Sequence, residues 1–527
     1  MGKIETVVDI VRVHGAGRAD HPALVLGDRE VSWGELYRRS CQVANLLAAA
    51  GVDAHDRVAF LDKNGIEHFE VFYGAAMLNA VCVDVNWRLA GPEIEYIVND
   101  AGAKVLIVGP DFVPVLETFA DALTTVTEIL VIAGPDGPTS RFGDYTSTVD
   151  GHSEIDRGIT QASEDVAFQL YSSGTTGRPK GVMLSNDNFF ALLPTAQEMW
   201  RIDADTVNLV AMPLVHIGGG GWAIAGMFSG ATSIIVRDLD PAALVGLFVD
   251  KGITNAFLVP AVLQFMLLVP GVEDGDYSKL RAIVYGASPI SEAVLATCVN
   301  VFKCDFWQAY GLTETTGAVV NLAPEDHDTD GPRRHLLRSC GKPGPGVGLR
   351  IVDTDTQLEA EVGQVGEIWI NGPQIMLGYW NMPEETAKSI TDGWFHTGDA
   401  GYVDADGYLY IHDRVKDMIV SGAENVYPAE VENVLMNHPG IADIAVIGVP
   451  DEKWGETAKA IVVRAGNDEG AALTEREVID FARERLAKFK CPTTVEWVDA
   501  LPRNPSGKVL KKDLRAPYWE GRSRNVN

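Results

Sequence analysis

The sequence predicts a multidomain α/β protein, and three observations carry that prediction. Apolar residues at helical spacing alternate with short strand-like runs along much of the chain. The 527 residues exceed the usual size of one hydrophobic core, so we expect two to four domains. Apolar residue types make up 46% and charged types 22% of the chain, a balance typical of packed globular protein rather than of disorder.

The first part of the chain alternates helices and strands. Leu36, Val43 and Leu47 share one helical face, and the apolar run that starts at Arg57 is short enough for a buried strand. This repetition predicts parallel strands covered by helices on both faces. The expected helices span residues 31–49, 69–80 and 91–101, and the expected strands span residues 57–62, 81–85 and 104–108.

A second α/β stretch is expected from residue 165 to residue 352, with strands at residues 208–212, 233–236, 255–259 and 282–285. The uncharged segment 207–236 contains six glycines and Pro213, which favours buried strands and a Gly-rich turn over a membrane span. Residues 363–411 read as a β-rich subdomain. The charged run 412–417 precedes a last segment of mixed helices and strands, so we place the domains at residues 1–413 and 414–527.

The chain is strongly acidic. It has 43 Lys and Arg against 73 Asp and Glu, a net charge of −30, which repels nucleic acid and anionic membrane surfaces at long range. The six cysteines show no metal-binding spacing, and the N-terminus lacks a secretory leader, so we expect a reduced, cytoplasmic protein without a membrane segment. A homodimer is compatible with the sequence, which leaves the oligomeric state open.

Residues 171–181 have the composition of a phosphate-binding loop. They contain three glycines, four Ser or Thr hydroxyls and two cations, so backbone amides, hydroxyls and Lys180 can all meet phosphate oxygens. The chain has no Walker A motif. On composition alone, a solvated flexible loop is the competing interpretation.

The same loop resembles the signature of the adenylate-forming superfamily, which includes acyl-CoA synthetases, peptide-synthetase adenylation domains and luciferases. The resemblance covers most of the chain, because one further motif precedes the loop and the others follow it, all in family order. These lie at residues 86–90, 285–288, 310–314, 366–367, 378–379, 394–399, 413–417, 422–430, 448–456 and 505–508.

The resemblance implies a fold and a set of nucleotide contacts. The large domain would hold two doubly wound αβαβα subdomains and the β-rich subdomain, followed by a small mobile α+β domain. Thr313 would bind the α-phosphate of ATP, and Glu314 would be the Mg²⁺ ligand. Asp399 would bind the ribose hydroxyls beside Arg414, for which a structural ion pair is the alternative. The remaining nucleotide-binding candidates are Ser172, Ser173, Gly174, Thr175, Thr176, Gly177, Lys180, Gly286, Ala287, Gln308, Ala309, Tyr310 and Gly311.

The resemblance also implies a two-step mechanism. Lys508 would stabilise negative charge while the acid attacks the α-phosphorus. The small domain would then rotate about Lys416 and open a thiol channel that includes Gly422. Ala423, where the family most often has glycine, leaves that last contact open.

The segment Met212–Trp222 resembles the start of the family's acyl pocket, with His216 near the acid, although a core histidine is the competing interpretation. The absence of Asp and Glu from residues 212–236 favours an acid with a neutral tail. Four consecutive glycines with Trp222, Phe257, Leu258 and Met266 suggest an apolar slot for a fatty acid. If Trp222 closes the slot, an aryl or alicyclic acid fits better.

Three functions remain at this point. The first is an acyl-CoA ligase of fatty acid metabolism that uses ATP, Mg²⁺ and CoA. The second is an enzyme that adenylates an acid and loads it on a carrier-protein thiol. The third, a silent nucleotide-binding relative, is disfavoured because Lys508, Glu314 and Asp399 are all present. Residues 448–456 look like the free-standing CoA ligases, which favours the first.

Overall fold

The computed structural model describes residues 2–133, 140–173, 178–288, 290–354, 356–414, 417–421, 424–451, 454–503 and 509–520. The chain forms two compact units. Unit 1 comprises Met1–Leu337, Pro343–Gly348 and Asn371–Gly393, and unit 2 comprises Arg338–Lys342, Leu349–Ile370 and Trp394–Asn527. This division does not test where a mobile domain begins, so the boundary between residues 413 and 414 stays a prediction.

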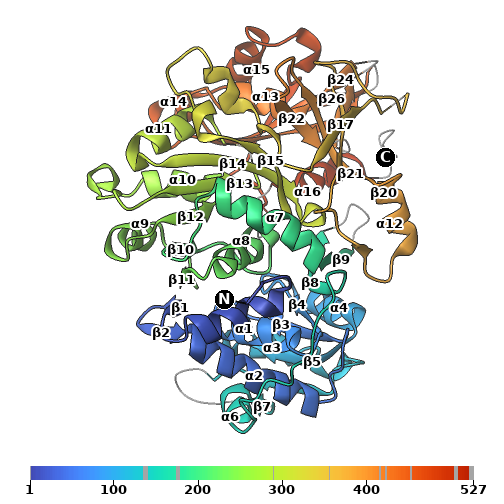
Figure 1. The fold of residues 1–527 in the computed structure, drawn as a ribbon. Coiled ribbons are helices and arrows are strands. Elements are labelled where there is room, and N and C mark those ends of the chain that lie inside the picture. Colours follow the sequence, from blue (N-terminus) through green and yellow to red (C-terminus); the bar gives the residue numbers. More distant parts are fainter. Residues whose placement is uncertain are drawn as a thin grey trace. The chain divides into compact units, whose positions relative to one another are not determined.

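The first sheet of unit 1 has eight strands in the order β19-β9-β8-β4-β3-β5-β6-β7. Neighbours from β8 to β7 run parallel, and β9 and β19 add an antiparallel edge. The strands are β3 Arg57–Leu61, β4 Val81–Asp84, β5 Ala103–Val108, β6 Glu128–Val131, β7 Gly143–Asp144, β8 Val166–Ser173, β9 Pro179–Ser185 and β19 Gly378–Tyr379. The helices of this region are α1 Val7–Gly17, α2 Trp33–Ala49, α3 Ile66–Ala76, α4 Gly91–Ala101, α5 Val113–Leu116 and α6 Tyr145–Asp150 (Figure 1).

The second sheet has nine strands in the order β16-β15-β14-β13-β12-β10-β11-β1-β2. The strands from β14 to β1 are parallel, as predicted for an α/β layer. They are β1 Pro22–Leu26, β2 Arg29–Ser32, β10 Val207–Val210, β11 Thr232–Ile235, β12 Asn255–Leu258, β13 Ala282–Gly286, β14 Asp305–Leu312, β15 Gly317–Leu322 and β16 Lys342–Pro343. The helices are α7 Asn186–Met199, α8 Ile217–Phe228, α9 Pro241–Asp250, α10 Pro260–Leu267 and α11 Glu292–Phe302. Unit 1 also holds α12 Pro383–Ser389 and β20 Ile390–Thr391.

The predicted elements of both α/β stretches are confirmed to within a few residues, with one exception. The Gly-rich turn expected within residues 207–236 is wrong, because residues 217–228 form the helix α8. Glycine disfavours a helix locally, yet here it permits a close tertiary approach. A Cβ on Gly219 would lie 2.1 Å from the Pro213 carbonyl oxygen, and one on Gly218 would lie 2.9 Å from the Phe257 ring.

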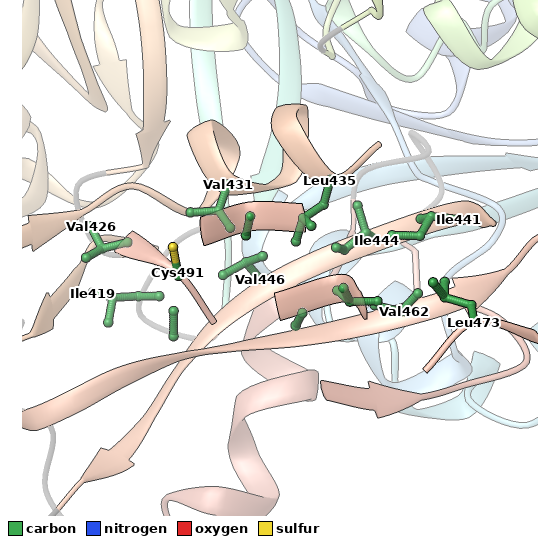
Figure 2. Close-up of a cluster of buried hydrophobic side chains, with 14 residues drawn as sticks. Ile419, Val426, Val431, Leu435, Ile441, Ile444, Val446, Val462, Leu473 and Cys491 are labelled. Atoms are coloured by element: carbon green, nitrogen blue, oxygen red, sulfur yellow. The ribbon is translucent and has the colours of Figure 1, made fainter. Parts of the chain in front are cut away.

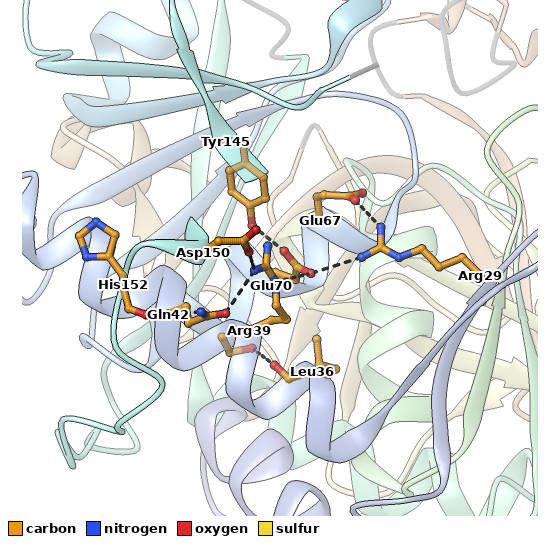
Figure 3. Close-up of polar contacts among 10 residues, drawn as sticks. Arg29, Leu36, Arg39, Gln42, Glu67, Glu70, Tyr145, Asp150 and His152 are labelled. Atoms are coloured by element: carbon orange, nitrogen blue, oxygen red, sulfur yellow. Dashed lines mark hydrogen bonds and ion pairs between the residues drawn. The ribbon is translucent and has the colours of Figure 1, made fainter. Parts of the chain in front are cut away.

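A buried ionic network joins three helices of the first sheet (Figure 3). Glu70 of α3 is 1% exposed and accepts from Tyr145 Oη of α6 at 2.8 Å. Arg39 of α2 donates to Glu70 at 3.3 Å and to Asp150 at 2.5 Å, and Arg29 lies 3.8 Å from Glu70. Burial raises the pKa of Glu70, and Arg39 opposes that shift. The network therefore fixes α2, α3 and α6 through one carboxylate.

Unit 2 contains two sheets. The first contains β17 Gly348–Val352, β18 Gly366–Asn371, β21 Trp394–Val403 and β22 Leu409–Arg414. Strands β18, β21 and the start of β22 lie within residues 363–411 and confirm the β-rich region predicted there. The second has the order β24-β23-β26-β25, with β27 beside β26. Its elements are β23 Ile419–Ser421, β24 Glu424–Val426, β25 Ile441–Asp451, β26 Gly455–Arg464, β27 Thr494–Trp497, α13 Pro428–Leu435, α14 Asp468–Ala472, α15 Glu475–Arg483 and α16 Lys511–Arg515.

The last segment of unit 2 has its own core, as the α+β prediction requires. Val431 and Leu435 of α13 pack on Ile444, Val446 and other aliphatic side chains of the sheet (Figure 2). These side chains are at most 6% exposed, so the segment buries enough apolar surface to form a separate core. Among the described residues, no helix has both the length and the apolar character to cross a bilayer.

Candidate active site

The predicted phosphate loop is the tip of the β8–β9 hairpin in unit 1. Ser172 on β8 lies directly opposite Lys180 on β9 in the strand register. Two of the predicted phosphate ligands are therefore paired across the base of the loop. Gly174, Thr175, Thr176 and Gly177 lie outside the described residues, as does the side chain of Ser173.

Glu314 is a carboxylate that contacts this hairpin directly. It lies in the short 3₁₀ turn Thr313–Thr315, which directly follows β14, and it is 8% exposed. Its Oε1 accepts hydrogen bonds from Ser172 Oγ at 2.9 Å and from Tyr379 Oη at 3.1 Å. Thr315 Oγ1 accepts from the Leu312 amide at 2.8 Å and so fixes the turn. The structure thus brings the predicted metal ligand to the predicted phosphate loop.

These residues fit a Mg²⁺ ion by the chemistry of their donors. Mg²⁺ prefers hard oxygen ligands, and Glu314 provides a nearly buried carboxylate with hydroxyl groups beside it. No described residue donates to Glu314 Oε2. Thr313, half-buried at the start of the same turn, adds a further hydroxyl.

Tyr379 and Glu385 are the site residues that the sequence did not single out. Tyr379 lies on the edge strand β19, and burial and the Glu314 charge raise the pKa of its hydroxyl. Glu385 of α12 forms an ion pair with Lys180, whose Nζ also lies 4.8 Å from the centre of the Tyr379 ring. The motif Gly378–Tyr379 was a signal for the tyrosine. Nothing in the sequence pointed to Glu385, which is 205 residues from Lys180.

The predicted adenine contacts lie on two adjacent parallel strands. Gly286 of β13 is paired with Ala309 of β14, and a Cβ on Gly286 would lie 2.1 Å from the Ala309 carbonyl oxygen. A Cβ on Gly311 would lie 1.7 Å from the Gly317 carbonyl oxygen.

Ala287 is exposed and has φ +66°, a left-handed conformation that is strained for alanine. Gln308, Ala309 and Tyr310 precede Gly311 on β14, so this strand leads directly to Thr313 and Glu314.

His327 is hydrogen-bonded to Tyr285 near the end of β13. His327 Nδ1 lies 2.8 Å from the Ala323 carbonyl oxygen and must therefore donate, so Nε2 accepts from Tyr285 Oη at 3.0 Å. Burial lowers the pKa of His327 to about 4. The neutral imidazole thus holds Tyr285, the residue that precedes Gly286.

His216 lies at the N-cap of α8, and its carbonyl oxygen accepts from the amides of Gly219 and Gly220 at 2.8 Å each. Asn64 fixes the preceding loop because its side chain bonds Met212 O at 3.1 Å and the Leu214 amide at 2.9 Å. The His216 side chain is half-buried. A Cβ on Gly317, three residues after Glu314, would lie 3.7 Å from Ile217 Cγ1, so the start of α8 is close to the Glu314 turn.

The four residues proposed to line an apolar slot are all buried. Trp222 is 5% exposed, and its Nε1 donates to Leu209 O at 3.0 Å. Its ring centre lies 5.5 Å from that of Trp200 and 6.2 Å from that of Phe257. Trp222 is therefore part of a packed aromatic group. Leu258 and Met266 are each fully buried.

The two predicted ribose ligands lie in unit 2. Asp399 of β21 is 6% exposed and is directly opposite Arg414 of β22 in the strand register. The Asp399 amide donates to Thr397 Oγ1 at 3.0 Å. The Arg414 side chain, Lys416, Gly422 and Lys508 lie outside the described residues, so their roles stay predictions.

One further group of side chains that could ligate a metal occurs among the described residues, and its members are hydrogen-bonded to one another. His68 Nε2 lies 2.7 Å from Asp84 Oδ2, and Cys82 Sγ donates to Asp84 Oδ1 at 3.4 Å. Burial, with Asp84, raises the pKa of the Cys82 thiol well above its usual value. Metal binding requires the thiolate, so this chemistry fits a metal poorly. We therefore keep Glu314 as the metal candidate.

Known proteins resemble the chain over its whole length. Residues 11–380 match the AMP-binding enzyme family, and residues 430–508 match the AMP-binding enzyme C-terminal domain. ScoC of Streptomyces coeruleorubidus, a fatty acid–[acyl-carrier-protein] ligase, is 40% identical, and the alignment covers 100% of this chain and 99% of that protein. FadD13 of Mycobacterium tuberculosis, a long-chain-fatty-acid–CoA ligase, is 35% identical over 93% of this chain and 94% of that protein.

Solved structures agree with the sequence relatives. ATP-bound MatB from Rhodopseudomonas palustris has a TM-score of 0.86 at 32% identity, with 97% of this chain and 99% of that chain covered. Other relatives are named for aromatic acids, such as a feruloyl-CoA synthase from Amycolatopsis that is 37% identical.

The fold and the site together define an ATP-using ligase with an adenylate-forming centre. The chain belongs to the AMP-binding enzyme family, the adenylate-forming superfamily, and is an acid–thiol ligase that activates its acid by adenylation. The predicted family, fold class and reaction type are confirmed.

Proposed function

We propose that this protein converts a fatty acid to its CoA thioester through an acyl-adenylate. In the first step, a carboxylate oxygen of the acid bonds to the α-phosphorus of ATP, and the bond between that phosphorus and the bridging oxygen breaks to release pyrophosphate. In the second step, the CoA sulfur bonds to the acyl carbon, the thiol proton is lost, and AMP leaves with the bonding electrons. The observation that carries this proposal is the Glu314 carboxylate, held by Ser172 and Tyr379 beside the loop that contains Lys180.

The predicted site residues of unit 1 would act in the first step. Thr313 would bind the α-phosphate, and Lys180 with Ser172 would bind the outer phosphates. Gly286, Ala287 and the strand from Gln308 to Gly311 would contact adenine. Glu314 would hold Mg²⁺, which when bound supplies positive charge for the phosphate oxygens.

The remaining roles belong to the C-terminal part of the chain. Asp399 and Arg414 would hold the ribose, which their shared register on β21 and β22 supports. Lys508 would neutralise the charge that develops at the α-phosphorus. Residues 414–527 would then turn about Lys416, withdraw Lys508 and open the thiol channel beside Gly422.

The choice of a fatty acid rests on the absence of Asp and Glu from residues 212–236, beside His216. No carboxylate of this segment is available for the ammonium group of an amino acid. The names of ScoC and FadD13 point to the same substrate class. A compact aryl or alicyclic acid is the second candidate, because Trp222 packs on Trp200 and bonds Leu209 O.

The thiol acceptor has two candidates as well. Residues 448–456 favour CoA, as in free-standing ligases. The relative that matches the full chain at 40% identity is named for an acyl carrier protein, which supports the carrier thiol as the alternative.

The test is pyrophosphate release over a panel of fatty and aromatic acids, with CoA, with a phosphopantetheinylated carrier protein, or with neither. We expect release with fatty acids and a thioester with CoA. A thioester that forms only on the carrier protein would refute the CoA proposal, and release with aromatic acids alone would refute the fatty acid. A Glu314→Gln variant should lose pyrophosphate–ATP exchange, and exchange at the native rate would refute the metal role.

We also propose a cytoplasmic location, because all six cysteines are free thiols and the net charge of −30 disfavours anionic membrane surfaces. Cell fractionation tests this, and recovery of the enzyme in a membrane pellet would contradict it.

A further inference from the structure

The Lys180 ammonium is nearly buried and already has an anionic partner. The Lys180 side chain is 7% exposed, and its Nζ forms an ion pair with Oε1 of Glu385, whose side chain is 25% exposed. The same Nζ lies 4.8 Å from the centre of the Tyr379 ring. The cation expected to bind phosphate is therefore held between a carboxylate and an aromatic face.

Hydrogen bonds and strand pairing around Glu385 hold it in this position. Thr386, the next residue of α12, accepts from the Tyr379 amide at 2.9 Å and donates to Met382 O at 2.9 Å. Gly378 has φ +144°, and a Cβ there would lie 2.7 Å from Thr386 Cγ2, so only glycine allows α12 to approach β19. β19 is in turn paired with β9, the strand that contains Lys180. The contact is thus built by backbone pairing rather than by two free surface side chains.

The charges around Lys180 act against a polyphosphate. Within this group Lys180 is the cation, whereas Glu385 and Glu314 are carboxylates. An incoming phosphate is attracted by the ammonium and repelled by the carboxylate that the ammonium already neutralises. Because Lys180 is nearly buried and Glu385 is 25% exposed, solvent screens this competition only in part.

We propose that Glu385 is an internal counter-anion that competes with the outer phosphates of ATP for Lys180. It lowers the affinity for polyphosphate and thereby favours the departure of pyrophosphate after adenylation. The inference rests on the proposed function, since it takes Lys180 as a ligand of the outer phosphates. Glu385 would act through Lys180 and is not itself a catalytic residue.

The test compares Glu385→Gln with Glu384→Gln in the full-length protein. Both variants remove one negative charge from α12, but Glu384 is exposed and forms no ion pair with a described residue. Calorimetry would measure the Kd values of ATP·Mg²⁺, of pyrophosphate and of adenosine, which lacks phosphates.

We expect Glu385→Gln to bind ATP and pyrophosphate about five- to tenfold more tightly, a change typical of one removed like charge in a partly screened site. The affinity for adenosine should stay within about twofold of the wild-type value, and Glu384→Gln should match the wild type for all three ligands. Inhibition of turnover by added pyrophosphate should strengthen in Glu385→Gln alone.

Two further variants separate competition from a structural role. Glu385→Asp keeps the charge and should keep the affinity for pyrophosphate near that of the wild type. In a Lys180→Met background, Glu385→Gln should give no gain in pyrophosphate affinity, because the contested cation is absent.

Several results would overturn the proposal. Weaker binding of pyrophosphate by Glu385→Gln would mean that Glu385 orients Lys180 for phosphate. An equal gain in Glu384→Gln would mean a general charge effect, and a parallel change for adenosine would mean a structural one. A wild-type protein that binds neither ATP nor pyrophosphate would refute the proposed function itself, which is a different outcome from all of these.

Discussion

The Glu314 carboxylate is positioned by two hydroxyl groups that come from distant parts of unit 1. Ser172 precedes it by 142 residues and Tyr379 follows it by 65 residues. Both hydroxyls donate to the same oxygen, which orients the carboxylate and leaves the second oxygen without a described donor. A carboxylate that is oriented in advance does not have to reorganise when charge develops in the transition state, which lowers the free energy of activation.

Tyr379→Phe tests this arrangement. A hydrogen bond to a charged group contributes about 1.5–3 kcal/mol, part of which water recovers in an open site. We therefore expect pyrophosphate–ATP exchange to fall by roughly tenfold and the half-saturating Mg²⁺ concentration to rise. Tyr277→Phe is the control, since that buried hydroxyl donates to Val272 O at 2.7 Å. Equal losses in both variants would contradict a specific role for Tyr379.

A site residue could be predicted where a local motif marks it, and its partners could not be predicted where only a tertiary contact defines them. Lys180 lies in a loop whose composition indicates phosphate binding, and Glu314 lies in a local motif whose role is implied by the family resemblance. Tyr379 lies in a local motif, but its contact with Glu314 and that of Glu385 with Lys180 join distant segments, so no local pattern predicts either contact. Burial, which makes these contacts strong, is likewise a tertiary property.

His327 makes stability depend on pH. Its pKa is lowered from 6.5 to about 4 in the folded protein, mainly by burial. For a base with a lowered folded pKa, the contribution to stability is complete above pH 6.5 and is lost as the pH falls toward 4, because the unfolded chain takes up the proton first. Between pH 7.5 and pH 5 the loss should be about 2 kcal/mol.

The measurement is urea unfolding of the wild type and of His327→Gln at several pH values. We expect the variant to be less stable at pH 7.5 and the difference between the two proteins to shrink by about 2 kcal/mol at pH 5. A difference that stays constant with pH would contradict the buried neutral imidazole.

At the scale of elements, α8 shows where sequence patterns mislead. Periodicity predicted the strands on either side of α8 because their apolar runs are short and bounded by turn residues. The four glycines predicted a turn, since glycine lowers helix propensity. Tertiary packing reverses that preference, because Gly219 and Gly220 let the helix approach the carbonyl oxygens of Pro213 and Leu214.

Two alanine substitutions in α8 distinguish packing from propensity. Gly219→Ala would place a Cβ 2.1 Å from Pro213 O, so we expect a loss of roughly 2 kcal/mol or more in the free energy of unfolding. A Cβ on Gly221 meets the flexible Ile217 side chain at 3.2 Å, so Gly221→Ala should gain up to about 1 kcal/mol.

Thermal or urea unfolding of both variants measures the change in the free energy of unfolding that each substitution causes. Equal effects of the two substitutions would show that close approach does not explain the glycines. If the acid lies along α8, Gly221→Ala should also raise KM for the larger acids of the panel while the protein stays folded.

At the scale of the whole molecule, the sequence predicted two domains, and the structure has two compact units whose segments interleave along the chain. Residues 338–342 and 349–370 belong to unit 2 although they precede the end of unit 1. Such interleaving depends on long-range strand pairing, which composition and periodicity do not reveal. The net charge of −30 could be read directly, and it explains why phosphate binding needs local groups such as Lys180.

The two-step mechanism makes its sharpest prediction for Lys508, at the end of the chain. If one domain presents this cation for the first step and withdraws it for the second, Lys508→Ala should lower adenylate formation by roughly a hundredfold or more. Thioester formation from a supplied acyl-adenylate should stay within about threefold of the wild type, because that step has no need of the cation. Lys512→Ala, an exposed lysine of α16, is the matched control and should change neither step. Equal loss of both half-reactions in Lys508→Ala would mean that a single arrangement of the chain catalyses both steps, since removing one group then impairs each of them.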